Sequence, residues 1–310
     1  MPESFDVYHI SGFRIGQTII EAATCICVNM FLIISGYFGL RLKWESIVKI
    51  CLLLLSVYIP FHLLAAIYKS EFNVFSFTRD FLVITKSGYF IQCYLMLIFL
   101  SPVLNSFVEK YAKHLVLKWT IVFLVIEFWF GCMMKVEALG LNQGYSVIHF
   151  VLMYMIARCL FLYRTELTKV NRWIWGVGYL VCIVVISLMY IAGFKYCWDY
   201  SNPVVVFSSI CSFMPFIYYN YENKLINWIA QSTLAVYVIQ VTNPVHSVIV
   251  KVDCFLLEMN SYSVYLLKSL LFIILFFFLC ILYDKICGIV INPLYKCVLK
   301  FVGSKNVNYC

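Results

Sequence analysis

The feature that most constrains this chain is a series of apolar runs, each long enough to cross a lipid bilayer. A transmembrane helix needs roughly 20 mainly apolar residues, and runs of about that length recur along nearly the whole sequence. They lie at 17–40, 47–67, 89–107, 116–134, 145–163, 173–194, 204–220, 232–250 and 263–283. We therefore predict an all-α, polytopic integral membrane protein, a helical bundle of about nine transmembrane helices in a single domain over 1–310.

Composition excludes the soluble alternative. Hydrophobic residues make up 64% of the chain and charged residues only 12%, whereas a soluble domain is about one quarter charged. A soluble fold with so few polar side chains could not cover its own surface. The 14 cysteines are spread along the apolar runs without a Cys-x-x-Cys pair, which favours buried thiols over a disulfide framework and predicts no metal site.

The net charge of +8 reflects short basic clusters between the apolar runs rather than a continuous basic face, so nucleic acid is not an expected partner. Most of the clusters follow the odd-numbered runs, and positive charge marks the cytoplasmic side of a membrane protein. We therefore expect a multi-pass protein of a bacterial inner (cytoplasmic) membrane, with its N-terminus outside and its C-terminus in the cytoplasm. Two amphipathic stretches, 75–88 and 292–302, are expected at the membrane surface.

Polar groups at membrane depth are costly and mark sites with a structural partner or a function. On the first run, a stripe of small and polar residues falls on one helical face: Glu21, Cys25, Asn29, Ser35 and Gly39. Such a stripe fits a helix–helix contact or the lining of a polar cavity, and an ionisable Glu21 is more than packing requires. Glu21 is therefore a candidate catalytic residue.

Two later runs also carry polar faces. On the fifth run, Asn142, Tyr145 and His149 share one face of a predicted helix. A neutral imidazole such as that of His149 can take and return a proton near pH 7, although a lone histidine is more often satisfied by a neighbouring carbonyl. On the eighth run, the polar residues fall on one side before a proline that breaks the helix: Thr233, Tyr237 and Gln240, then Pro244.

Four segments in order carry a family resemblance. The first is Val28-Asn-Met-Phe-Leu-Ile-Ile-Ser-Gly-Tyr-Phe, followed by Arg41 and Lys43, and the second is Tyr89-Phe-Ile-Gln-Cys-Tyr with Leu100-Ser-Pro-Val-Leu-Asn105. The third is Gly144-Tyr-Ser-Val-Ile-His149 with Tyr154, and the fourth is Ser232-Thr-Leu-Ala-Val-Tyr-Val-Ile-Gln240. Together they resemble the membrane acyltransferase 3 family, whose bacterial members acylate cell-surface sugars.

The resemblance implies an O-acyltransferase that uses acyl-CoA, most often acetyl-CoA, as donor substrate and binds no cofactor. A glycan or lipid-linked sugar would accept the acyl group. It implies that Arg41 and Lys43 meet the phosphates of the donor and that Ser35 and Tyr37 shape its channel. Asn105, Tyr237 and Gln240 are further binding candidates, and His149 is the candidate acid–base group.

Two departures from the family pattern limit this expectation. The family opens with a helix that bears an Arg and a later His, whereas this sequence offers only His9 and Arg14, in the reverse order. The family has a ten-helix core, and without this first helix nine remain, as predicted here. Without it we expect weak or no acyltransferase activity. Gln240 stands where many relatives place His. A polysaccharide exporter or polymerase and a catalytically impaired, truncated family member are the alternative interpretations.

Overall fold

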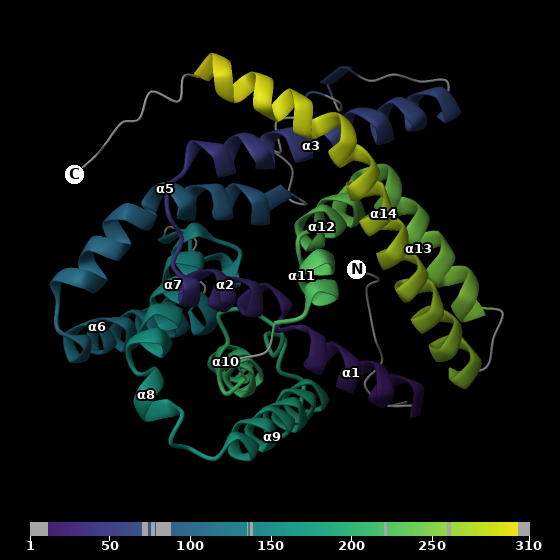
Figure 1. Cartoon of the computed structure of the whole chain (residues 1–310). Helices are drawn as coiled ribbons and strands as arrows, with labels where there is room; N and C mark the ends of the chain where they lie inside the picture. The colour runs from purple at the N-terminus through teal and green to yellow at the C-terminus, as the bar shows by residue number, and fades with distance from the viewer. Residues whose placement is uncertain are drawn as a thin grey trace. The chain divides into compact units, whose positions relative to one another are not determined.

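A computed structural model describes residues 12–69, 74–75, 78, 88–134, 136, 139–219, 222–258 and 262–302. Helices account for every regular element in these ranges (Figure 1). The longer helices are α1 (Gly12–Thr24), α2 (Cys27–Phe38), α3 (Trp44–Lys69), α5 (Tyr89–Lys110), α6 (Lys113–Ile126), α7 (Val147–Leu162), α9 (Arg172–Ile191), α10 (Pro203–Ile217), α12 (Thr233–Val241), α13 (Asn243–Glu258) and α14 (Tyr262–Val302). The shorter ones are η2 (Glu127–Met133), η4 (Asn142–Gly144), α8 (Arg164–Leu167) and α11 (Lys224–Ala230).

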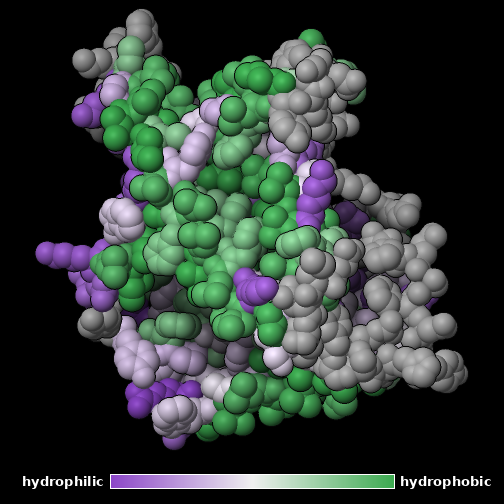
Figure 2. Space-filling model, turned by 90° about the vertical axis from the view of Figure 1, so that its right-hand side faces the viewer, coloured by the Kyte–Doolittle hydropathy of each residue, from purple (hydrophilic) through white to green (hydrophobic). Residues whose placement is uncertain are grey.

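The helices confirm a helical membrane protein but not nine spans. Six helical segments in the described part of the chain are long and apolar enough to cross a membrane, or seven if the bent pair 224–241 and 243–257 counts as one span. Two of the predicted spans, at 145–163 and 204–220, correspond to the shorter apolar helices α7 and α10. On the face that Figure 2 shows, most of the coloured surface is hydrophobic, as expected where lipid is the solvent.

Contacts divide the chain into two compact units, 1–42 with 93–220 and 43–92 with 221–310. The single-domain expectation stays a prediction. In the first unit, α2 packs against α7 and α10, α6 packs against α7, and α9 packs against both α10 and α1. Helices α2 and α7 run parallel, since Asn29 contacts His149 near their N-terminal ends and Gly39 meets Arg158 near their C-terminal ends.

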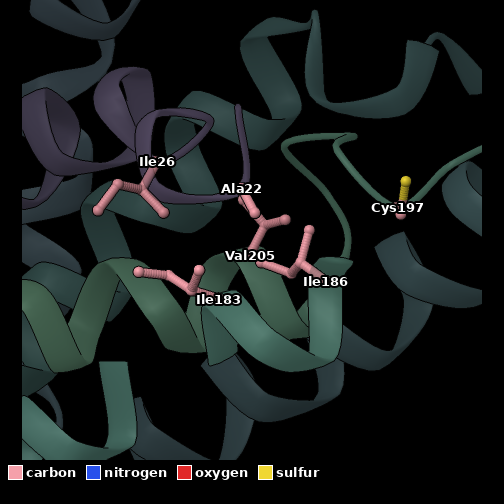
Figure 3. Packing of buried hydrophobic residues seen from close by; sticks show 6 residues of the cluster. All are labelled: Ala22, Ile26, Ile183, Ile186, Cys197 and Val205. Atoms are coloured by element: carbon pink, nitrogen blue, oxygen red, sulfur yellow. The ribbon is translucent and has the colours of Figure 1, made fainter. Parts of the chain in front are cut away.

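The first predicted span is broken rather than continuous. A turn at Cys25–Ile26 separates α1 from α2, and the Tyr179 hydroxyl donates to the Ala23 carbonyl at 2.9 Å. This bond satisfies one backbone oxygen near the break, as membrane depth requires. Around the break, apolar side chains of four segments pack together (Figure 3): Ala22, Ile26, Ile183, Ile186, Cys197 and Val205.

Close packing of α2 on α7 depends on a glycine. A Cβ at Gly36 would lie 2.6 Å from the Cβ of Ala157 and 3.0 Å from the carbonyl oxygen of Tyr154. Small residues let two membrane helices approach in this way. Gly36 is not a member of the predicted stripe of small and polar residues, whose packing interpretation stays a prediction.

In the second unit, α3, α12, α13 and α14 pack on one another, and the Tyr283 hydroxyl donates to the Ser56 carbonyl at 2.6 Å. The predicted break near Pro244 is confirmed, because the helical segments on its two sides form an angle of 79°. The stretch 292–302 continues α14 without a break. Most of the stretch 75–88 lies outside the described residues.

Candidate functional site

The most unusual polar group in the first unit is a buried chain of three side chains centred on His149. Its Nδ1 lies 2.9 Å from Glu127 Oε1, and its Nε2 lies 2.8 Å from Asn29 Oδ1. The three residues are 0%, 1% and 0% exposed, in the order His149, Glu127, Asn29. Three elements supply them, because Asn29 lies on α2, His149 on α7, and Glu127 begins the π-helix η2.

The bonding partners fix where the protons lie. Asn29 Nδ2 donates to the Tyr200 carbonyl at 3.1 Å, so Asn29 Oδ1 faces the ring and can only accept from His149 Nε2–H. One further proton remains between His149 Nδ1 and Glu127 Oε1. The pair is therefore either an imidazolium with a carboxylate or a neutral imidazole with a carboxylic acid, and both forms carry no net charge, which lowers the cost of burial.

The second carboxyl oxygen of this pair has no partner. Glu127 Oε2 is buried and accepts no hydrogen bond in the structure. A buried carboxylate oxygen without a donor is expensive, and such an atom calls for a functional explanation. The site thus presents one oxygen that can accept a bond from an incoming donor, while the other oxygen is held by histidine.

Two members of the buried chain lie near helix starts. Asn29 lies in the first turn of α2, and His149 lies in the first turn of α7, where its N–H donates to the N-cap Ser146 Oγ at 3.2 Å. The π-helical turn that begins at Glu127 is a rare element, found mostly at functional sites.

A strained turn covers this group. Asn142, Gln143 and Gly144 have consecutive φ angles of 41°, 58° and 93°, a left-handed conformation that costs free energy in non-glycine residues and gathers at functional sites. Gly144 is required on a second ground, because a Cβ there would lie 2.6 Å from Tyr200 Cβ. Leu141, which begins this turn, is itself buried.

An aromatic pair lies where the turn reaches the surface. The rings of Tyr145 and Tyr200 are 5.0 Å apart with an interplanar angle of 55°, and Tyr145 is 41% exposed. Burial of part of the ring raises the pKa of Tyr145, and the nearby Asp199 carboxylate raises it further. The Tyr200 carbonyl also accepts the hydrogen bond from Asn29. Tyr200 therefore links the surface ring pair directly to the buried chain.

A second polar cluster lies at the opposite ends of the same parallel helices. The Tyr154 hydroxyl donates to Asn105 Oδ1 at 2.6 Å and accepts from the Leu40 N–H at 3.2 Å. Asn105 Nδ2 donates to the Leu40 carbonyl at 2.8 Å. The chain just after α2, where the helix ends and backbone groups need partners, is thus satisfied by α5 and α7.

Basic side chains surround this second cluster. The guanidinium groups of Arg158 and Arg164 lie 5.0 and 4.7 Å from the centre of the Phe161 ring, and Arg158 Nη1 donates to the Tyr37 carbonyl at 3.5 Å. Arg158 Nε is buried without a partner. Arg158 is nine residues beyond His149 on α7, which places this basic end about 14 Å from the buried chain along the helix axis.

An ion pair joins α6 to α8 at the same end. Lys113 donates to Glu166, and this bond, with a second from Thr165, lowers the pKa of Glu166 to about 2. Both side chains are about half exposed, so the pair contributes little at physiological salt. The ion pair lies at the edge of the basic end.

The structure separates the other predicted site residues. Glu21 lies on α1 and accepts from Gln17 Nε2 at 3.2 Å, with no bond to His149. The Ser35 hydroxyl lies 3.5 Å from the Tyr94 hydroxyl. The Tyr37 ring packs edge-on against Phe161 at 5.5 Å. Arg41 is exposed at the basic end of the first unit.

Three predicted binding residues belong to the second unit. Lys43 is exposed. The Tyr237 ring lies 4.8 Å from the Phe90 ring. Gln240 and Thr233 are both exposed on α12. Their proposed binding roles stay predictions.

Two sequence expectations about the site need correction. Asn142 and Tyr145 do not share a helical face with His149, because a 3₁₀ turn occupies 142–144 and α7 begins only at Val147. Glu127 was missed, although it is the lone carboxylate within the predicted span 116–134. A single acidic residue at membrane depth is itself a signal for a partner.

Within the described residues no group of three or more His, Cys, Asp and Glu side chains could hold a metal ion. Comparison with protein-family models, with curated proteins and with solved structures finds no match for this chain. The fold and the apolar helices define a helical membrane protein, and its activity has to be argued from the site.

Proposed function

We propose that this protein is a membrane O-acyltransferase that moves an acyl group, acetyl being the first expectation, from acyl-CoA to a hydroxyl of a cell-surface sugar. The observation that carries the proposal is the unpartnered Glu127 Oε2 beside His149. An acid–base pair of this kind, with one oxygen free to accept a bond from a hydroxyl, suits the activation of an alcohol.

The family resemblance also supports the proposal, because the segments that carry it contact one another. Three of the four family-like segments meet in the first unit: α2 and α7 join through Asn29 and His149, and α5 joins them through Asn105 and Tyr154. The fourth segment contributes Tyr237, which packs on the start of the second segment at Phe90. Segments chosen only for their sequence are therefore in contact.

The chemistry assigns distinct roles to the members of the chain. The acceptor hydroxyl donates to Glu127 Oε2 and loses its proton to the carboxylate as its oxygen attacks the thioester carbon. The new ester C–O bond forms, the C–S bond breaks, and the thiolate of CoA leaves and takes up a proton from the pair. His149 holds Oε1 and shares the proton, while Asn29 fixes the ring in the Nε2–H tautomer.

The basic end supplies the donor side of the proposal. Arg158, Arg164 and Arg41 offer guanidinium groups for the phosphates of acyl-CoA. By the positive-inside rule this end faces the cytoplasm, in a bacterial inner membrane, and the Glu127–His149 end faces outward. In this proposal α7, α10 and the bent pair each cross the membrane once, which gives nine spans. The thioester end of acyl-CoA then has to extend about 14 Å along α7, from the basic end that holds the phosphates to the Glu127–His149 pair.

Mass spectrometry of the surface glycan tests the proposal. Cells that lack the gene should lose a mass increment equal to one acyl group on a sugar residue, and the wild-type gene should restore it. The Glu127→Gln gene should not, whereas the Glu166→Gln gene, changed only at the exposed ion pair, should. An unchanged glycan in the deletion strain would refute the acyltransferase assignment.

A further inference from the structure

One apolar side chain inserts into the protein from the exposed segment that connects η2 to α7. Within 139–145, which is described throughout, Leu141 is the one buried apolar side chain, at 3% exposure. Its neighbours Gly140 and Asn142 are both exposed. Leu141 therefore fills a place in the interior of the first unit, and the proposed reaction gives it no role.

The place that Leu141 fills lies beside Glu127. A Cβ at Gly131 would lie 3.0 Å from Leu141 Cβ, 3.5 Å from Leu141 Cδ1 and 3.7 Å from Glu127 Cγ. The side chains of Leu141 and Glu127 therefore meet over the bare backbone of Gly131, which is itself buried. Because the Leu141 side chain is apolar, it offers no hydrogen-bond donor to the unpartnered Glu127 Oε2.

The backbone on both sides of Leu141 is strained. Gly140 and Asn142 have left-handed φ angles of 62° and 41°, and Gly140 has open space around it. Two backbone hydrogen bonds of the turn are internal to it, from the Gly144 N–H to the Leu141 carbonyl at 3.1 Å and from the Tyr145 N–H to the Asn142 carbonyl at 2.9 Å. A left-handed residue other than glycine costs free energy, which a rearrangement of the segment releases.

The end of the turn nearest α7 is anchored. A Cβ on Gly144 would lie 2.6 Å from Tyr200 Cβ, and the Tyr145 ring packs 5.0 Å from the Tyr200 ring. Helix α7 begins only at Val147. The segment 140–143 can therefore swing about Gly144 while α7 and His149 stay in place.

We propose that 140–143 is a lid and that Leu141 is the plug with which this lid closes the approach to Glu127. Withdrawal of Leu141 opens a path from the surface to Glu127 Oε2 for the acceptor hydroxyl, and its return keeps water away from the acyl donor. An ordinary core leucine needs neither left-handed residues on both sides nor a carboxyl oxygen without a partner beneath it. The inference rests on the acyltransferase proposal only for the identity of the molecule that the lid admits.

Labelling of Glu127 with dicyclohexylcarbodiimide, an apolar reagent that reacts with buried carboxylic acids, tests the lid without any acyl donor. Mass spectrometry measures the rate of adduct formation at Glu127 in the full-length protein in lipid nanodiscs. Leu141→Ala should raise this rate at least about tenfold, because the loss of a buried leucine side chain favours the open state. Leu139→Ala, changed at a 45% exposed residue of the same segment, should label at the wild-type rate.

A matched pair of glycines tests the hinge. Gly140 and Gly193 have φ angles of 62° and 83°, and both have open space where a Cβ would lie. Gly140→Ala strains the closed lid and should raise the labelling rate about fivefold, whereas Gly193→Ala should not change it. The reactivity of the buried Cys159 towards N-ethylmaleimide reports unfolding and should stay at the wild-type level in all four variants.

Two results would overturn the lid: equal labelling of Glu127 in wild type, Leu141→Ala and Gly140→Ala, or labelling that rises in both variants only in step with Cys159 reactivity. Unchanged labelling in a protein whose acyl transfer requires Glu127 overturns the lid and leaves the acyltransferase proposal intact. Labelling that depends on Leu141 in a protein that transfers no acyl group supports the lid and overturns the acyltransferase proposal.

Discussion

A double-mutant cycle between Glu127 and His149 measures how strongly the buried pair is coupled. His149→Leu removes the partner of two acceptors, Glu127 Oε1 and Asn29 Oδ1. Loss of one member of a buried charged pair costs about 3–5 kcal/mol. Glu127→Leu leaves only His149 Nδ1 without a partner, because the ring keeps its bond to Asn29, and should cost about 1–3 kcal/mol.

The double variant shows whether the Glu127 and His149 side chains are energetically coupled. With both side chains replaced by leucine, only Asn29 Oδ1 loses its partner, at about 1–3 kcal/mol, and the leucines fill apolar surroundings. The double variant should therefore be more stable than the sum of the single losses implies, by about 3 kcal/mol. His149→Leu alone should also be clearly worse than Glu127→Leu alone.

Unfolding in mixed micelles of rising SDS content gives these free energies, with exposure of buried cysteines as the signal. The buried cysteines of the first unit include Cys93, Cys132 and Cys159. They become reactive to a thiol dye when the unit unfolds. A control cycle pairs His149→Leu with Glu21→Leu, which do not touch, and should be additive within about 0.5 kcal/mol. Additivity of Glu127→Leu and His149→Leu within the same margin would refute the pairing.

Three further predictions concern packing and charge in the same unit. Gly144→Ala should destabilise the protein by about 2 kcal/mol, since its Cβ meets Tyr200 and its φ is +93°, whereas Gly176→Ala, with open space around it, should be neutral or stabilising in thermal unfolding. Tyr154→Phe should cost about 1–2 kcal/mol in the same measurement, through the lost 2.6 Å bond to an asparagine side chain. The carboxyl of Glu166 has its pKa lowered from 4.5 to about 2, so its ion pair contributes fully above pH 4.5 and loses that contribution as the pH falls through about 2. The small difference in melting temperature between wild type and Glu166→Gln should therefore shrink over that interval and in high salt, and a difference that grew with acid would contradict the pairing.

Much of the architecture could be predicted from the sequence, because lipid allows few choices. A run of apolar residues at bilayer length becomes a helix, and Pro244 signalled the bend that the structure contains. The turn at Cys25–Ile26 carried no such signal. It contains neither proline nor glycine and is stabilised by tertiary contacts, including the Tyr179 hydroxyl on the Ala23 carbonyl.

The site was predictable in part. His149 and Asn29 stood out as polar residues at membrane depth, but their contact joins residues 120 positions apart, and periodicity within one helix does not reveal such a pair. Glu127 carried the same signal and was overlooked. Glu21, chosen from the stripe, lies on the far side of the turn from Asn29, because the stripe assumed one straight helix.

The most direct test of the account is acyl transfer from radiolabelled acetyl-CoA to surface glycan in membranes that contain the full-length protein. Glu127→Gln keeps the shape of the side chain but removes the group that accepts the hydroxyl proton, so kcat should fall at least about a hundredfold. Glu166→Gln should transfer at the wild-type rate. Transfer by Glu127→Gln within about threefold of wild type would contradict the central role of the Glu127–His149 pair.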